Sequence, residues 1–543
     1  VGTAQTAGIV MCVQTDGSFR SVVVPQTVAA GTPLFNITVA GTSYKFSKNE
    51  DFTYTPGKIS KFTIKISRKN HTGEYEIELI DTQIVPWTED RNIHEGEARQ
   101  YYCVNCTEPG TLGELIKADK KNPKKIKNLK VSGKITTEDF YFMRDEMTIL
   151  EAVNLKESKI VNVKVSEYPV YGHDDDHGNR TVFYKREAGV VDDVIPDEAF
   201  YNKKSLYYFT FPEKVTEIGC NAFSCSSISG VLVIPDDVKY IFENGFSATN
   251  IGSVQFPDNL EIIDQNTFSS CSSLSGTLSL PQTLRYIGSE TFSSCSLTGN
   301  LFLPQSLEYI GSEAFQSTDY FVGGLSIPEK ITKIGYASFS TNLKFDGVKF
   351  NGVLKLNNVT TIENEAFMRC QFTGELIIPE GVTEIGSNAF YNNNFSSVKF
   401  PSTLKIIKSG AFWGNLRISD GLVLPEGMVS IGSFAFEKCS NIRSLEFPST
   451  LQTIQSGAFK KCSGVNKIIC HSTEPPTVIS SAFDGVPKDN FTVEVPANAV
   501  KRYQADPVWG QFKRIAAHYD FSVSRSRARA LNAQTTKTYT LRA

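Results

Sequence analysis

The sequence predicts a mostly β chain of several domains. An N-terminal β-sandwich precedes a repetitive β-solenoid with short helical or 3₁₀ turns on its outer side. The 543 residues exceed the size at which a single core stops growing, about 250–300 residues. The composition holds 37 Phe but only 5 Met and 3 Trp, which indicates one structural slot that is copied many times. That slot recurs at a regular spacing, and such a period is typical of solenoids.

The repeat runs from Ile195 to Val495. A Phe returns every 22–24 residues, except for one step of 28, and a small residue precedes it, which is Ala in nine of thirteen copies. Five residues before the Phe stands Ile in twelve copies and Val478 in the last, and eleven residues before it stands Pro in ten copies. The thirteen Phe are Phe200, Phe223, Phe246, Phe268, Phe292, Phe315, Phe339, Phe367, Phe390, Phe412, Phe436, Phe459 and Phe483.

Each copy is interpreted as one coil of the solenoid. An alternating stretch such as residues 278–280 (LSL) points two apolar side chains inward. Pro then ends the strand because it has no N–H for a ladder. The chain returns through the Ile segment, and the Phe inserts from the far side in a short helical or 3₁₀ turn. One coil cannot bury these side chains alone, so stability is expected to reside in the contacts between neighbouring coils.

A second column of small side chains stands three residues after the Phe. We interpret it as a ladder of side chains that hydrogen-bond to turn backbone inside the coil. Disulfides between adjacent coils, such as Cys271–Cys295 or Cys439–Cys462, and metal ligation stay open as alternatives. The column contains Cys271, Cys295, Cys370, Cys439 and Cys462, interleaved with Thr249, Thr318, Asn342, Asn393 and Asn415.

Residues 281–295 (PQTLRYIGSETFSSC) and 429–439 (VSIGSFAFEKC) show most closely the pattern Leu-x-x-Ile-x-x-x-Ala-Phe-x-x-Cys. With the Leu-x-Leu-Pro strand, this pattern resembles the BspA-type leucine-rich repeats of bacterial surface proteins. The resemblance covers about 300 residues. It implies an exported protein that adheres to host matrix proteins or to other cells. The copy at Leu354 departs from the pattern, since Asn357 replaces Pro and the step is 28, so a local bulge or loop is expected there.

Both ends of the solenoid are expected to be covered, because a terminal coil exposes an apolar edge. The segment after Pro496 resembles the closing unit of such arrays, with Tyr503, Trp509 and Phe512 as covering residues. Residues 126–155 contain two weaker coils. We therefore predict a β-sandwich over 1–92, a linker and irregular N-terminal cap over 93–195, the repeat solenoid over 196–495, a C-terminal cap over 496–520 and a tail over 521–543.

The first 92 residues contain short alternating runs, such as 62–66 (FTIKI) and 75–79 (YEIEL), separated by turn signals. Several short strands at this spacing predict the β-sandwich. The segments YTPGKISKFTIKISRKN and IVPWTED, with VVVPQTV and ITVAGTSYKF, resemble fimbrillin-family proteins, which build surface fibres of some Gram-negative anaerobes. The resemblance is to the C-terminal half of these proteins. The resemblance therefore leaves two roles open, a fibre subunit and a spacer or mount.

No residue cluster predicts catalysis, a cofactor or a metal. Residues 94–97 (HEGE) lack the second His of a zinc-protease motif. Cys103 and Cys106 have zinc-knuckle spacing without a second pair, so they are interpreted as a local disulfide or two unrelated thiols. Residues 172–178 (GHDDDHG) are the best candidate for a metal, with three carboxylates and two imidazoles, but Lys185 stands where a calcium loop needs Glu, and the segment is interpreted as a solvated insertion. Phosphate-binding, nucleophile-elbow and dinucleotide-binding motifs are absent from the sequence.

The charge balance is flat, with 55 Lys and Arg against 58 Asp and Glu. This balance argues against a nucleic-acid partner, and Arg525, Arg527 and Arg529 are interpreted as part of a flexible terminus. No apolar run approaches the roughly 18–20 residues of a membrane span. Residue 1 is Val, and no basic-then-apolar leader is present, so an export signal or lipid anchor is expected to have been removed or to lie outside this chain.

The candidate binding site is the outward face of the strands. If Leu278 and Leu280 point inward, the residue between them points outward. Neither that column nor its neighbour forms an aromatic stripe or a run of one charge, so recognition would rest on shape and scattered contacts. The outward column is Thr210, Val233, Gln255, Ser279, Phe302, Ser326, Lys355, Ile377, Lys399, Val423 and Glu446.

Three functional hypotheses follow. The first is a non-enzymatic protein of the cell surface or outer membrane that binds a host extracellular-matrix or cell-surface protein through the solenoid. The second is a structural tip or anchor subunit that joins other fimbrial subunits through the fimbrillin-like domain. The third is a metal-dependent enzyme at residues 173–177.

Overall fold

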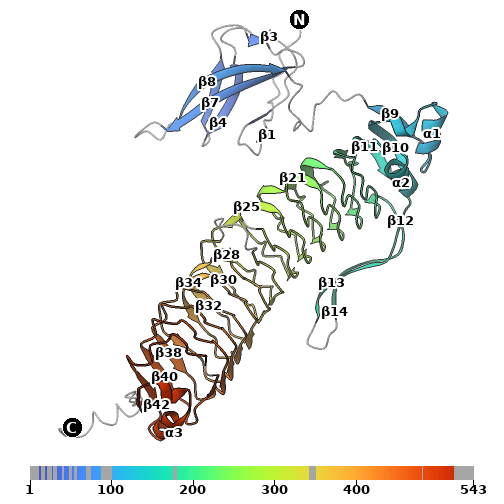
Figure 1. Ribbon diagram of the computed structural model, residues 1–543. Coiled ribbons are helices and arrows are strands. Elements are labelled where there is room, and N and C mark those ends of the chain that lie inside the picture. Colours follow the sequence, from blue (N-terminus) through green and yellow to red (C-terminus); the bar gives the residue numbers. More distant parts are fainter. Residues whose placement is uncertain are drawn as a thin grey trace, which may run out of the picture. The chain divides into compact units, whose positions relative to one another are not determined.

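The computed structural model describes residues 101–174, 180–318, 320–341, 350–479 and 481–518, and the course of strands β1–β8 before them. The chain divides into two compact units, Val1–Arg99 and Gln100–Ala543. Figure 1 shows the second unit as a single row of stacked coils that ends at helix α3 (Val500–Ala505). The mostly β architecture predicted from the sequence is confirmed.

The first unit is built from antiparallel strand pairs. The alternating runs at 62–66 and 75–79 lie in the long strands β7 and β8, which pair along their full length. The other pairs are β1 with β2, β3 with β6 and β4 with β5. The strands are β1 (Cys12–Val13), β2 (Phe19–Arg20), β3 (Thr27–Val28), β4 (Pro33–Val39), β5 (Thr42–Ser47), β6 (Phe52–Thr53), β7 (Lys58–Arg68) and β8 (Tyr75–Pro86).

The strands that carry the Leu-x-Leu pattern follow one another in parallel along the first face of the solenoid. Three of them, β9–β11, precede the Phe repeat, so the segment before it is coiled in the same way. The strands are β9 (Tyr102–Cys106), β10 (Asn128–Ile135), β11 (Ala152–Ile160), β17 (Tyr208–Thr210), β19 (Ser229–Val233), β21 (Asn250–Gln255), β23 (Ser275–Thr277), β25 (Ser296–Asn300), β27 (Tyr320–Val322), β28 (Leu325–Ser326), β30 (Leu354–Lys355), β32 (Thr373–Ile377), β34 (Asn394–Lys399), β36 (Leu422–Val423), β38 (Ser444–Phe447), β40 (Lys467–Cys470), β42 (Thr492–Val495) and β43 (Arg514–Ala517).

The Ile segments form a second face of two-residue strands. They form two parallel ladders, β16 to β26 and β29 to β41, in which each Ile pairs with the corresponding residue of the next coil. The strands are β16 (Val194–Ile195), β18 (Glu217–Ile218), β20 (Tyr240–Ile241), β22 (Ile262–Ile263), β24 (Tyr286–Ile287), β26 (Tyr309–Ile310), β29 (Lys333–Ile334), β31 (Thr361–Ile362), β33 (Glu384–Ile385), β35 (Ile406–Ile407), β37 (Ser430–Ile431), β39 (Thr453–Ile454) and β41 (Thr477–Val478).

The thirteen Phe of the repeat form one unbroken stack through the core. Consecutive ring centroids are 5.1–5.7 Å apart, and the ring planes are inclined by 1–18°. The long step between Phe339 and Phe367 does not interrupt it, since these rings are 5.4 Å apart. Thirteen of the 37 Phe belong to this stack, which explains much of the Phe excess in the composition.

The chain around each Phe is a run of tight turns. Around Phe390, the residues two before and two after it, Asn388 and Asn392, have left-handed backbone with φ of 55° and 54°. The N–H groups of these three residues donate to carbonyls of the next coil, at 2.7–2.9 Å. Bonds from N–H to the carbonyl three residues earlier, as in a 3₁₀ turn, close each turn. The left-handed residues keep these turns from joining into a helix.

The column three residues after the Phe is a hydrogen-bonded ladder, which confirms the interpretation from the sequence. The Cys439 thiol donates to the carbonyl of Phe412 at 3.2 Å, and the Asn415 amide donates to that of Phe390 at 2.8 Å. From Cys271 onward, the described side chains of this column donate to a Phe carbonyl of the preceding coil, whereas Thr249 donates to that of Phe246 in its own coil. No disulfide joins the cysteines in the described part of the chain.

This ladder predicts how the cysteines react. Burial raises the pKa of Cys439 to about 12 and also raises that of Cys462, whereas Cys103 is exposed. Because the thiolate is the nucleophile, iodoacetamide at neutral pH should alkylate Cys103 at least about a hundredfold faster than either coil cysteine. Peptide mass spectrometry before and after denaturation measures this ratio. Equal rates in the native protein would contradict the ladder.

The departure at Leu354 is accommodated by side-chain bonds. Asn357 has left-handed backbone with φ of 45°, and its amide donates to the carbonyl of Ile327 in the preceding coil at 2.6 Å. Residues 342–349, where the additional length falls, lie outside the described residues, as does Asn342 of the ladder.

Both ends of the described solenoid are covered. Helices α1 (Leu112–Ala118) and α2 (Thr137–Asp145) and the 3₁₀ turn η2 (Pro123–Lys125) lie at the start. At the far end, α3 and the 3₁₀ turn η3 (Trp509–Gln511) bury Tyr503, Trp509 and Phe512 to 0–2 % exposure, as predicted. The Trp509 ring contacts Phe483, and its indole N–H donates to the carbonyl of Pro476.

Candidate partner-binding face

The outward column points to solvent along the first face. Ten of its eleven predicted members are exposed, and Glu446 is half-buried. Their strand neighbours Leu278 and Leu280 are 3 % and 7 % exposed, so the alternation assumed from the sequence holds. The apolar members are the most conspicuous, since Phe302 is 70 % exposed and Val423 is 61 % exposed.

Among the repeat coils, the charged residues of the outward column and of the column beside it lie in the C-terminal part of this face, and some of them form pairs. The Lys399 ammonium lies 3.0 Å from the Glu375 carboxylate. His471 Nε2 lies 2.8 Å from Glu446, and His518 Nδ1 lies 2.6 Å from Glu494. The ion pair of Lys399 with Glu375 reduces the charge that this part of the face offers to a partner.

The middle part of the face, from β17 to β28, carries no charged residue in the outward column or in the column beside it. We call these twelve residues the uncharged surface: Thr210, Val233, Gln255, Ser279, Phe302, Ser326, Tyr208, Val231, Ser253, Thr277, Asn300 and Gly324. The two columns read separately do not show this division, which becomes visible when the strands are aligned in space.

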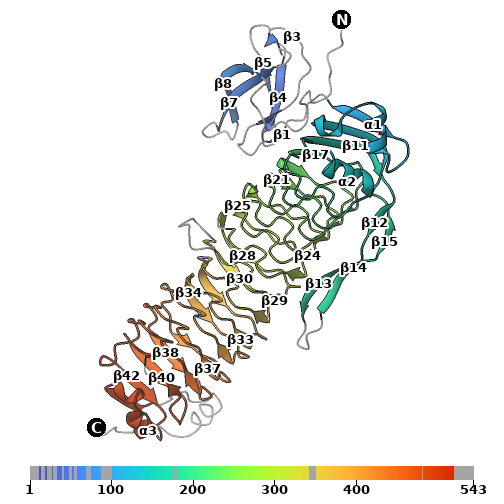
Figure 2. The ribbon, with the colours of Figure 1, turned by 45° about the vertical axis from the view of Figure 1, so that its right-hand side comes forward.

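The second face carries a feature that sequence reasoning missed. The hairpin of β13 (Tyr168–Asp174) and β14 (Arg180–Arg186) lies alongside the coils, as Figures 1 and 2 both show. It is joined to the solenoid by the antiparallel pair β12 (Val163–Val165) and β15 (Gly189–Val191). The segment that was interpreted as part of an irregular cap with a solvated insertion thus contains a strap across several coils.

Aromatic rings hold the hairpin on the second face. Tyr184 stacks on Tyr240 with ring centroids 4.1 Å apart, and Phe183 lies 5.1 Å from Tyr286 and 5.7 Å from Tyr309. The Tyr286 hydroxyl donates to the carbonyl of Tyr171 at 2.7 Å. Together with Val170, Phe242 and Ile262, these residues form a hydrophobic cluster separate from the main core.

A signal for this contact was present in the sequence. The residue before the repeat Ile is Tyr240, Ile262, Tyr286 and Tyr309 in four successive coils, and it turns to Lys333 and Thr361 in the next two. The position four before the Phe is Gly in many coils but Phe242 and Asp264 in two coils under the hairpin. The run of large apolar residues before the repeat Ile therefore marks the docking area.

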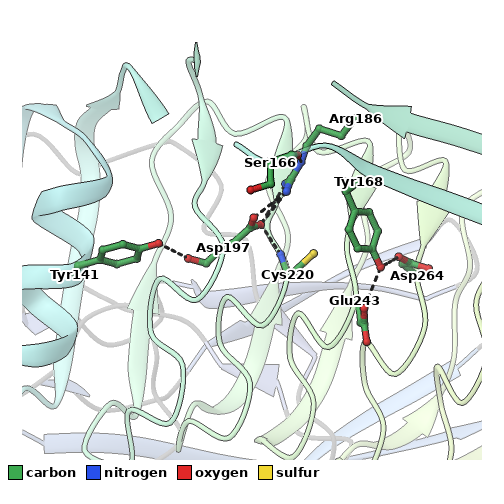
Figure 3. A network of polar contacts seen from close by, with 8 residues as sticks. All are labelled: Tyr141, Ser166, Tyr168, Arg186, Asp197, Cys220, Glu243 and Asp264. Atoms are coloured by element: carbon green, nitrogen blue, oxygen red, sulfur yellow. Dashed lines mark hydrogen bonds and ion pairs between the residues drawn. The ribbon is translucent and has the colours of Figure 1, made fainter. Parts of the chain in front are cut away.

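Two polar contacts anchor the base of the hairpin (Figure 3). Arg186, 4 % exposed at its side chain, forms an ion pair with Asp197 at 2.8 Å, and Asp197 also accepts the backbone N–H of Cys220. The Tyr168 hydroxyl lies 2.9 Å from the Asp264 carboxylate and 3.1 Å from that of Glu243. Burial raises the pKa of Asp264 to about 6.

The candidates for chemistry do not assemble into a site in the described part of the chain. Cys103 and Cys106 point to opposite faces of β9, one exposed and one buried, so they are two unrelated thiols. No group of three or more His, Cys, Asp or Glu within the described residues is arranged to hold a metal ion. The side chains of 94–97 and 173–178 and the arginines at 525–529 lie outside the described residues.

The described residues also contain no helix that is long and apolar enough to cross a membrane.

The parallel strand ladders, the proline-ended strands and the single Phe stack define a leucine-rich-repeat solenoid. The sequence model of the BspA-type leucine-rich repeat region matches residues 193–321, 299–419 and 415–488, in six copies. The chain belongs to this family. Residues 3–87 match the model of the fimbrillin-like family, as the resemblance indicated. Both are families of bacterial surface proteins.

Several solved structures are similar to the chain. A leucine-rich repeat protein from Bacteroides ovatus is 21 % identical, and the match covers 65 % of this chain and 99 % of that one with a TM-score of 0.35. The pneumococcal vaccine antigen PcpA is 18 % identical, and the match covers 57 % of this chain and 85 % of that one with a TM-score of 0.34. A leucine-rich repeat protein from Eubacterium ventriosum is 17 % identical, and the match covers 65 % of this chain and 88 % of that one with a TM-score of 0.31. No curated protein matches the chain.

Proposed function

We propose that the chain is a non-enzymatic adhesin, which binds a protein of the host matrix or of a cell surface through the first face of its solenoid. The observation that carries the proposal is the uncharged surface, where polar side chains surround Phe302 at 70 % exposure and Val233 at 56 %. An exposed aromatic ring among uncharged neighbours can be desolvated by a protein partner without stripping water from a charge. Membership of a family of bacterial surface proteins supports the same role.

The test introduces charge into this surface. Purified protein is measured for binding to a panel of immobilised extracellular-matrix proteins and to whole cells, and Phe302→Glu is compared with the native chain. We expect Phe302→Glu to weaken the strongest interaction at least about tenfold, because a carboxylate would have to be buried against the partner. Leu416→Glu is the matched control, since Leu416 is 51 % exposed but lies outside the first face. Absence of binding to every surface, or equal binding by both variants, would contradict the proposal.

A second role is supported by the fimbrillin-like match, which falls within the separate compact unit 1–99. In this role, the first unit would join the chain to a surface fibre as a tip or anchor subunit. Removal of residues 1–92 should then abolish incorporation into fibres and leave the solenoid folded. Incorporation at the native level would reject this role.

A further inference from the structure

The hairpin β13–β14 can leave the solenoid without opening the main core. Its apolar contacts belong to the separate cluster around Tyr286 and Phe242, whereas the Phe stack and the repeat Ile side chains lie in the main core. An isolated two-stranded hairpin is marginally stable in water. The hairpin therefore depends on the second face for its own order, while its departure leaves the Phe stack within the main core.

The polar centre of this contact consists of Tyr168, Asp264 and Glu243. When both carboxyl groups are charged, it has one hydrogen too few for two hydrogen bonds. One hydroxyl, that of Tyr168, faces both Asp264 and Glu243 at 2.9 and 3.1 Å, and it carries a single hydrogen. If Asp264 is protonated, its O–H donates to the Tyr168 oxygen, and Tyr168 donates to Glu243. If both are carboxylates, only one of them receives the hydrogen, and the other faces the hydroxyl oxygen.

Asp264 is the better placed of the two to hold the proton. It is 3 % exposed, and its other oxygen accepts the backbone N–H of Gln265 at 2.8 Å, whereas Glu243 is half-buried. The other titratable groups that face this centre are Cys220, Tyr286 and Tyr309 on neighbouring coils. Elsewhere under the hairpin, Glu217 accepts the Tyr184 hydroxyl at 3.0 Å, and burial raises its pKa as well. The nearest cation, Arg186, is paired with Asp197 and lies 4.7 Å above the Phe242 ring.

We propose that the hairpin is a pH-sensitive strap, which closes on the second face when Asp264 is protonated and loosens when Asp264 is charged. Opening of the strap uncovers the aromatic surface formed by Tyr240, Phe242, Tyr286 and Tyr309. The proposal does not rest on the proposed adhesive function.

The direction of the pH dependence follows from linkage. Burial raises the pKa of Asp264 to about 6 in the closed state, and opening exposes the group and returns the pKa toward its ordinary 3.8. Closing therefore takes up a proton between about pH 4 and pH 6. Closure is favoured most below this window and is weakened as the pH rises through about 6, by up to about a hundredfold in the closing equilibrium for a difference of about two pKa units.

Hydrogen exchange of the full-length protein tests the strap. After correction for intrinsic rates, amides of β13 and β14 should exchange about tenfold faster at about pH 7.5 than at about pH 5. Peptides from coils 430–460 serve as the internal control and should show no change. The Asp264→Asn variant imitates the protonated acid, because its amide can donate to Tyr168, and its hairpin should exchange at the same slow rate at both values of pH.

Two results would overturn the proposal: a hairpin rate that is independent of pH in the native protein, or an unaltered pH dependence in Asp264→Asn. If Asp264→Asn loses protection in coils 430–460 as well, that variant is generally destabilised and does not test the strap. The Glu243→Gln variant is then the test. Removal of the neighbouring charge should move the midpoint of strap opening to lower pH, since repulsion by Glu243 helps to raise the pKa of Asp264. A midpoint that stays in place would refute the role of this pair.

Discussion

Replacement of Phe390 by alanine is expected to lower the free energy of unfolding by about 3–5 kcal/mol. The Phe390 side chain is fully buried, and its ring stacks between Phe367 and Phe412 at 5.6 and 5.3 Å. The cavity cannot collapse easily, because the backbone N–H groups on this turn are fixed to the next coil. Denaturant unfolding, followed by circular dichroism, measures the loss.

Phe302→Ala is the control for this experiment. It removes the same side chain from a position that is 70 % exposed and outside the stack. We expect a change within about 0.5 kcal/mol, as for ordinary surface substitutions. Similar losses in the two variants would mean that the Phe column does not carry the stability of the solenoid.

Asp197→Ala is expected to destabilise the base of the hairpin by about 3 kcal/mol. The change leaves the buried guanidinium of Arg186 with only the Ser166 carbonyl as an acceptor, and it removes the acceptor of the Cys220 N–H. Hydrogen exchange in β12–β15 should rise sharply while coils near Phe436 keep their protection. This pattern would separate a local opening of the hairpin from general unfolding.

Glu375→Ala provides the matched comparison, since it also removes the carboxylate of an ion pair. Its partner Lys399 is 66 % exposed, and Glu375 is 39 % exposed. Exposed pairs contribute roughly 0–1 kcal/mol, so little change is expected. A loss equal to that of Asp197→Ala would show that burial does not distinguish the two pairs.

The path of the coil could be predicted from the sequence because its determinants are local and repeated. Strand alternation, proline and the Ile–Phe spacing recur in nearly every copy. A departure at a single position, such as Asn357, therefore does not change the path that the other copies predict. The hydrogen-bonded ladder three residues after the Phe was predictable for the same reason. Cys, Thr and Asn share size and hydrogen-bonding capacity, and the shared role is to satisfy the Phe carbonyl.

The hairpin could not be placed in the same way, because its position depends on contacts between residues far apart in the chain. Tyr168 reaches Asp264 across 96 positions, and no period relates the two. The outward direction of the candidate face followed from alternation alone, and the exposure of Phe302 agrees with it. The choice of that face as the binding site stays a prediction, because exposure alone does not select a partner.

The strap has a consequence for how the gene can change. In a parallel array, loss or gain of one whole coil between Phe412 and Phe459 recreates the same junction, because every coil presents the same ladder to its neighbours. Unequal recombination can therefore lengthen or shorten that part without a new fold. The hairpin contacts a fixed set of coils, from the coil of Tyr240 to the coil of Tyr309. One coil more or fewer between them would place Phe183 and Tyr184 next to the wrong residues. The strap thus fixes the number of coils beneath it, while the coils beyond it stay free to vary.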